Sequence, residues 1–158
     1  MKVLISILPV IVATTGALYI SAIDIQEMRI PNRILFPLYI ATVFLMLIAS
    51  IVEGEILHLV IALIGSLFSL FLFYFIHIMK PKGLGMGDVK FAGLLGLVLS
   101  WFAFPSGLWG LALAFIASAI FSAIAIVFRF RKMDLLIPFG PFMVFGLLVM
   151  EFRHYLAT

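Results

Sequence analysis

Long apolar stretches separated by short polar segments make up most of this chain. A helix needs about 20 largely apolar residues to cross the hydrocarbon core of a membrane. Six stretches approach that length, at residues 3–23, 34–52, 56–79, 87–104, 107–128 and 135–150. The pattern therefore predicts an all-α polytopic membrane protein built as a six-transmembrane-helix bundle.

The sixth stretch differs from the others because it contains Pro138, Gly140 and Pro141. Proline interrupts the hydrogen-bond ladder of a helix, so we expect the sixth segment to be broken at Pro138–Pro141. Irregular backbone at membrane depth persists only where protein or a water-filled cavity covers it. This segment is therefore expected to face the interior of the bundle rather than lipid.

Composition supports the membrane assignment. Of the 158 residues, 66% are hydrophobic and 11% charged, whereas a soluble domain is about half apolar and about a quarter charged. No linker or repeat divides the chain, so residues 1–158 are expected to form one domain. The absence of cysteine excludes disulfides and thiolate metal sites.

Basic residues are distributed unequally between the two sides of the predicted bundle. Eight of the ten lie at or beside the first, third and fifth connections: Arg29, Arg33, Lys80, Lys82, Lys90, Arg129, Arg131 and Lys132. The positive-inside rule places these connections in the cytoplasm and both termini outside. Because this distribution orients the chain in a bilayer, the net charge of +3 is not taken as a sign of nucleic-acid binding.

Two of the seven acidic residues stand at the ends of apolar stretches. Asp24 follows the first stretch and Asp88 opens the fourth, so both are expected at the cytoplasmic boundary. A carboxylate at the membrane edge is costly, which makes it a functional hypothesis by default. The other acidic residues are expected to be solvated loop or boundary charges: Glu27, Glu53, Glu55, Asp134 and Glu151.

Two interpretations of Asp24 and Asp88 are open at this point. Two carboxylates in one low-dielectric site share a proton and titrate as a pair. The ionised member can then take a proton from water while the protonated member polarises a carbonyl group, which suits hydrolysis. In the other interpretation both are helix-end residues, satisfied by caps, the helix macrodipole or the cations Arg29 and Lys90.

Each aspartate has distinctive neighbours. Gly85 and Gly87 precede Asp88, and glycine permits close approaches that other residues prevent. N–H groups at the start of that helix are available to bind a substrate carbonyl. Pro31 and Asn32 follow Asp24 and predict a turn between the first two helices.

Three blocks together resemble the type IV prepilin peptidase family, the Gly-x-Gly-Asp membrane aspartyl proteases. They are Asp24 with Pro31-Asn32, then Gly85-Met86-Gly87-Asp88, then Pro138-Phe139-Gly140-Pro141, in the family's order. The resemblance implies that Asp24 and Asp88 are the catalytic pair. It implies that the remaining motif residues bind substrate or shape the site: Gly85, Gly87, Pro31, Asn32, Pro138, Gly140 and Pro141.

The resemblance also implies a substrate and a location. The expected activity is removal of the short basic leader of pilin, pseudopilin or Flp-type precursors, at the cytoplasmic face of the inner membrane. The expected partners are the prepilin-like substrate, membrane lipid, and pilus or secretion machinery, with no nucleic acid. Larger bacterial members carry an N-terminal Cys-x-x-Cys region associated with N-methylation. This chain resembles the short, peptidase-only members, so methyltransferase activity is not expected.

Other interpretations compete with this one. The archaeal preflagellin peptidases are similar, although the Pro-Phe-Gly-Pro block favours the bacterial type. A proton-coupled carrier also uses intramembrane acids, and a non-catalytic assembly subunit would need neither aspartate. The dispersed histidines, His58, His77 and His154, lack metal-ligand spacing, so no metal or other cofactor is expected.

The charge distribution yields a direct test of topology. A single cysteine introduced by Lys82→Cys is expected to resist an impermeant thiol reagent in intact cells and to react after permeabilisation. The chain's own lack of cysteine gives a clean background. Labelling of intact cells at this position would overturn both the topology and the cytoplasmic site.

Overall fold

The computed structural model describes residues 2–79, 84–127 and 138–157, which form six helices and no strand. The helices are α1 (Lys2–Glu27), α2 (Asn32–Glu53), α3 (Ile56–Met79), α4 (Met86–Phe102), α5 (Phe104–Val127) and α6 (Gly140–Ala157). The predicted all-α architecture is confirmed. Several positions named above lie outside the described residues: Lys80, Lys82, Arg129, Arg131, Lys132, Asp134 and 135–137.

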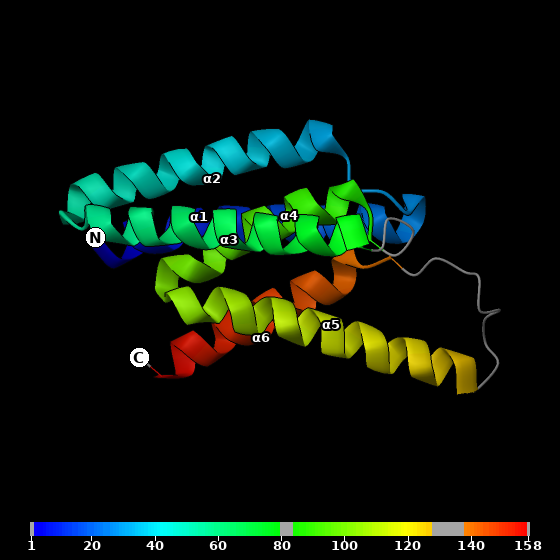
Figure 1. Ribbon diagram of the computed structural model, residues 1–158. Coiled ribbons are helices and arrows are strands. Elements are labelled where there is room, and N and C mark those ends of the chain that lie inside the picture. The colour runs from blue at the N-terminus through cyan, green and yellow to red at the C-terminus, as the bar shows by residue number, and fades with distance from the viewer. Residues whose placement is uncertain (1, 80–83, 128–137, 158) are drawn as a thin grey trace.

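The helices lie roughly side by side and alternate in direction (Figure 1). The N- and C-termini share one end of the molecule with the α2–α3 and α4–α5 turns. The end of α1 and the starts of α4 and α6 lie at the opposite end. The chain order therefore brings the three sequence blocks singled out above to one end of the bundle.

Four helices are long and apolar enough to cross a membrane: α1 over Ile5–Glu27, α2, α3, and α5 over Phe104–Ile124. Helix α4 has only 17 residues, and α6 carries Glu151 and Arg153. The prediction of six spanning helices is thus supported for four of them. The structure places α4 inside the bundle rather than against lipid.

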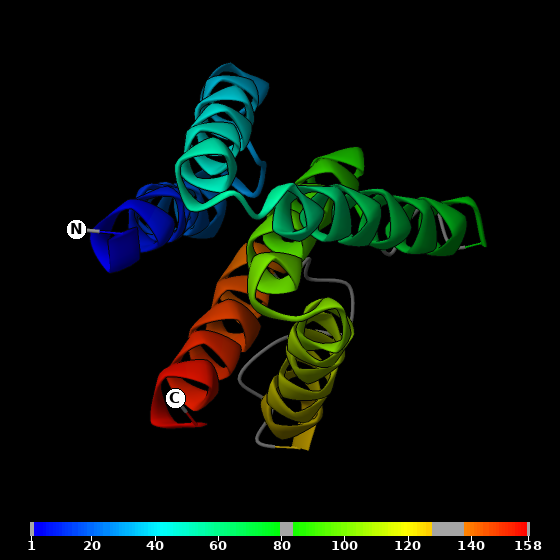
Figure 2. The same cartoon turned by 90° about the vertical axis from the view of Figure 1, so that its left-hand side faces the viewer.

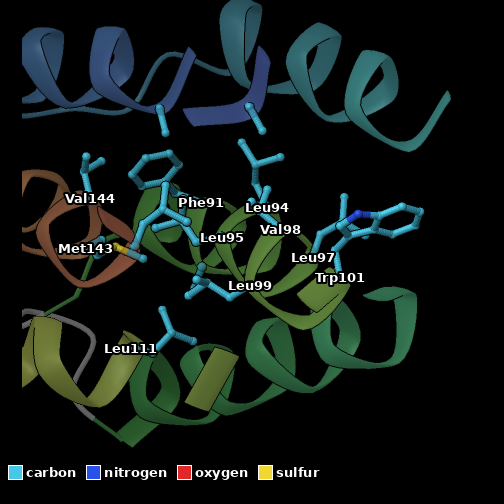
Figure 3. Close-up of a cluster of buried hydrophobic side chains, with 14 of the residues drawn as sticks. Phe91, Leu94, Leu95, Leu97, Val98, Leu99, Trp101, Leu111, Met143 and Val144 are labelled. Atoms are coloured by element: carbon cyan, nitrogen blue, oxygen red, sulfur yellow. The ribbon is translucent and has the colours of Figure 1, made fainter. Parts of the chain in front are cut away.

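Helix α4 is the centre of the fold. Every residue from Phe91 to Trp101 is buried, and α4 contacts each of the other five helices, which surround it in the end view (Figure 2). Its side chains form a continuous apolar cluster with Leu111 of α5 and Met143 of α6 (Figure 3). Other helices of the protein, rather than lipid, therefore cover α4 on its sides.

Glycines bring α3 and α4 close together. A Cβ atom at Gly96 would lie 2.9 Å from the Gly65 carbonyl oxygen and would also collide with the Ser69 side chain. Small residues at such crossings allow the backbones to approach, which drives helix association in lipid. A Cβ atom at Gly93, on the same helix, would meet Leu70 and Tyr39 only at 3.4 Å or more.

These two glycines make a matched pair for a stability test. The substitution Gly96→Ala is expected to destabilise the protein by about 1–3 kcal/mol, because backbone atoms of α3 must move to admit the methyl group. Gly93→Ala should change the stability little. The thermal unfolding midpoint of the purified protein in detergent measures both. Equal midpoints for the two variants would contradict the close approach of α3 and α4.

Candidate active site

Asp24 lies in the last turn of α1, and its side chain is 4% exposed. The sequence predicted that the first helix would end at residue 23. The helix in fact continues to Glu27, so Asp24 belongs to its hydrogen-bonded ladder and its carbonyl accepts from the Met28 N–H at 3.0 Å. Met28 has a φ of 54°, which turns the chain back toward the start of α2.

The carboxylate of Asp24 meets the start of α6. The Gly140 N–H donates to Asp24 Oδ2 at 2.9 Å, across 116 residues of sequence. The first N–H groups of a helix have no partner within it, so this donor is available, and the helix start favours a negative charge. A Cβ atom at Gly140 would lie 2.8 Å from the same Oδ2 atom. Only glycine admits the carboxylate this closely.

The predicted break in the sixth segment is the beginning of a helix. Helix α6 starts at Gly140, with the Phe139 carbonyl accepting from Phe142 and Met143. Pro138 lies before the helix, and Pro141 lies in its first turn, where a missing N–H costs no hydrogen bond. Helix α6 therefore begins within the predicted break, and these prolines occupy positions at which proline is compatible with a helix start. Residues 135–137, on the other side of the predicted break, lie outside the described residues.

Asp88 is the third residue of α4 and is half-buried. Its Oδ2 atom accepts a hydrogen bond from the Gly85 N–H at 2.9 Å, which is the usual bond of an acid at this position of a helix. Asp88 thus caps its own helix, as one of the two interpretations of the sequence expected. Burial raises the pKa of Asp88 to about 6, and the charge of Asp24 contributes to this rise.

The nearby cations bind elsewhere. Arg29 forms an ion pair with Glu27 at 2.8 Å, and Lys90 donates to Asn32 Oδ1 at 3.2 Å. Among the described residues, neither Asp24 nor Asp88 forms a salt bridge with a lysine or arginine. Of the helix-end interpretation, the cap is thus present at Asp88, whereas Arg29 and Lys90 bind other groups. Each carboxylate keeps one oxygen, Oδ1, without a hydrogen bond from the described residues.

The turn after α1 is attached to the start of α4. Ile30 is buried, and a Cβ atom at Gly87 would lie 3.0 Å from the Ile30 Cβ atom. Pro31 precedes α2, and its carbonyl accepts from Ile34 and Leu35. The bond between Lys90 and Asn32 links the same two segments. Of the residues suggested by the sequence, Gly140 bonds to Asp24 and Gly85 bonds to Asp88, whereas Gly87 meets Ile30 and Asn32 meets Lys90.

The remaining acidic residues differ in their burial. Glu27 and Glu55 are exposed, as expected. Glu53 is half-buried and accepts a hydrogen bond from Ser6. Glu151, expected to be a solvated boundary charge, is 7% exposed and accepts from Thr14 Oγ1 at 2.6 Å. Its spacing of seven and four residues from the buried Val144 and Leu147 was a sequence signal that it shares their helix face.

A cavity at the other end of the bundle is lined by two histidines. His58 and His154 line a cavity of about 450 Å³ with Glu53 and Trp101, far along the helices from Asp24. No group of three or more histidine, aspartate or glutamate side chains within the described part of the chain could hold a metal ion.

Comparison with known proteins gives one result. A model of the type IV leader peptidase family matches residues 11–128, which are 118 of the 158 residues. The chain belongs to this family of membrane proteases, which confirms the predicted resemblance. The matched region contains Asp24 and Asp88 and ends before Pro138. No curated protein and no solved structure matches the chain.

The contact between Gly140 and Asp24 can be tested directly. The substitution Gly140→Ala places a methyl group 2.8 Å from the carboxylate oxygen, so the carboxylate must move. A displacement of about 1 Å at a reacting group can lower turnover by about a hundredfold. The measurement is cleavage of a leader-bearing precursor by the purified variant.

Gly93→Ala is the control, because the added methyl group meets only ordinary contacts. If Gly140→Ala cleaves as fast as Gly93→Ala, the placement of Gly140 against Asp24 does not affect turnover.

Proposed function

We propose that this protein is an aspartic endopeptidase that removes the short basic leader from prepilin-like precursors. The observation that carries the proposal is the convergence of three distant sequence blocks on two carboxylates that no described cation neutralises. Membership of the leader peptidase family supports the same activity. Asp24 and Asp88 are the proposed catalytic residues.

The proposed reaction uses one water molecule and both carboxyl groups. The ionised carboxylate takes a proton from the water as the water oxygen attacks the carbonyl carbon of the scissile peptide bond. The protonated carboxyl group gives its proton to the carbonyl oxygen, which forms a neutral gem-diol. As the diol collapses and the C–N bond breaks, the leaving nitrogen receives a proton from the carboxyl group that the water had protonated. One hydroxyl of the diol returns its proton to the other carboxylate, which restores the pair to its starting state.

The hydrogen bonds to the two aspartates are compatible with one carboxyl group acting as the base and the other as the acid. Each aspartate accepts a backbone N–H at Oδ2, which orients the carboxyl group and leaves Oδ1 for the water or the substrate. A lysine or arginine beside either group would hold it ionised, and the pair would then not share a proton. The binding of Arg29 to Glu27 and of Lys90 to Asn32 avoids that outcome.

The proposed substrates are pilin, pseudopilin or Flp-type precursors, cleaved at the cytoplasmic face of the inner membrane. In the sequence, eight of the ten basic residues lie at or beside the first, third and fifth connections, which supports that orientation, with both termini outside. Asp24 belongs to the end of α1 and Asp88 to the start of α4, and these two helix ends lie at one end of the bundle (Figure 1). A proton-coupled carrier would instead need acids along a path through the membrane, so the peptidase is the better supported function.

The paired-aspartate mechanism predicts non-additive losses. Asp24→Asn and Asp88→Asn keep the side-chain volume but remove one ionisable group, so either change alone ends proton sharing. Each single variant is expected to lose leader cleavage almost completely, and the double variant should be scarcely worse. The rate should also depend on pH in a bell shape that belongs to the pair.

Protein level and cleavage must be measured on the same membrane samples, with Glu55→Gln at the other end as the control. A purely capping role predicts less protein and normal turnover per molecule. If either single variant accumulates normally and processes precursor near the unmodified rate, the mechanism is wrong.

A further inference from the structure

Glu151 is a buried carboxylate that the proposed chemistry does not use. It lies on α6 with 7% of its surface exposed, and its Oε1 atom accepts from Thr14 Oγ1 at 2.6 Å. Thr14 belongs to α1, the helix that carries Asp24. A buried acid inside a membrane bundle is costly and is retained where it has a role. Its position far from the two aspartates indicates a role other than bond cleavage.

Two hydrogen bonds join α1 to α6, and both require the same axial alignment of the two helices. The helices run antiparallel (Figure 1), with Thr14 bonded to Glu151 and Asp24 bonded to Gly140. Thr14 and Asp24 are ten residues apart on α1, and Gly140 and Glu151 are eleven apart on α6. At 1.5 Å per residue these separations are about 15 Å and about 16.5 Å. One bond therefore sets the axial alignment that the other requires.

Apolar packing specifies this alignment only weakly. The buried side chains of α6 between the two bonds are all apolar: Met143, Val144, Leu147 and Met150. Apolar contact is non-directional, and a slide of one turn, about 5.4 Å, presents a similar face again. A hydrogen bond tolerates only a few tenths of an ångström. Polar side chains between membrane helices supply this kind of selectivity.

We propose that Thr14 and Glu151 are positioning residues that hold α6 in the register which sets the Gly140 N–H against Asp24. The inference rests on the proposed peptidase function. It predicts that normal turnover requires a hydrogen-bond acceptor on the side chain of residue 151 but does not require a negative charge there. It also predicts an effect on turnover rather than on substrate binding, because neither residue lies near the two aspartates.

Four variants of the full-length protein, purified in detergent, separate these roles. Glu151→Gln keeps a carbonyl oxygen at the same reach, so kcat and KM should stay near the unmodified values. Glu151→Asp keeps the charge but shortens the side chain by one methylene, so the bond to Thr14 is lost. Thr14→Val removes the donor at nearly constant volume, and Thr14→Ser keeps it. Glu151→Asp and Thr14→Val should lower kcat about tenfold to a hundredfold at nearly unchanged KM, whereas Thr14→Ser should not.

Thr42 provides the matched control for Thr14→Val. It is fully buried, and its hydroxyl donates within its own helix to the Leu38 carbonyl at 2.8 Å. Thr42→Val therefore removes a buried hydroxyl without releasing one helix from another, and its kcat should stay near the unmodified value. A thermal midpoint for each variant shows whether a lower kcat accompanies general destabilisation.

The outcomes distinguish this inference from the proposed function. Loss of turnover in Glu151→Gln together with normal turnover in Glu151→Asp would show that charge, not register, is required, and would overturn the inference. Normal kcat in both Glu151→Asp and Thr14→Val, with Asp24→Asn inactive, would also overturn it while leaving the peptidase mechanism intact. If Thr14→Val does not accumulate, the comparison of Glu151→Gln with Glu151→Asp decides. Full activity of Asp24→Asn would instead refute the proposed function itself.

Discussion

The hydrogen bond from the Gly140 N–H to Asp24 is the interaction on which the site end of the bundle depends. A carboxylate buried in a low-dielectric interior needs a hydrogen-bond donor, and the last turn of α1 has no free N–H to offer because its N–H groups bond to carbonyls within the helix. Free N–H groups occur at helix starts. The start of α6 supplies one, so the last helix of the chain is attached to the first.

Asp88 meets the same requirement within its own helix. As the third residue of α4 it accepts the N–H of Gly85, and the glycines around it allow the α1–α2 turn to approach through Ile30. Each carboxylate thus accepts one backbone N–H, Asp24 from the start of another helix and Asp88 from the residue before its own helix. Their charges interact, while Arg29 and Lys90 bind other groups. This arrangement is the basis of the proposal that the two aspartates act as a pair.

The central position of α4 links this end to the rest of the molecule. Because the residues from Phe91 to Trp101 are buried on all sides, displacement of α4 would disturb every neighbouring helix. The close crossing at Gly96 and Gly65 fixes α4 against α3. Asp88 is therefore carried by the most constrained helix, whereas Asp24 depends on the alignment of two peripheral helices, for which the bond between Thr14 and Glu151 provides a second point of attachment.

The sequence alone determined the helical architecture and the two aspartates. The limits of α3 agree with the prediction, and those of α2 differ by at most two residues, because the length of an apolar stretch is a local property that membrane thickness constrains. The spacing of charged residues and glycines likewise singled out Asp24 and Asp88 without reference to contacts. The end of α1 was predicted four residues early, since the helical ladder continues past the first charge into Glu27.

Only the tertiary structure decided what each polar group binds. The prolines at 138 and 141 indicated an interrupted helix, and only the structure showed that α6 begins between them, at Gly140, whose N–H bonds to Asp24. Glu151 resembled a solvated charge beside Arg153, but the face of α6 that packs on α1 buries it. These bonds join residues 116 and 137 positions apart. Local sequence determines which groups need partners, whereas the packing of distant helices determines which partners they find.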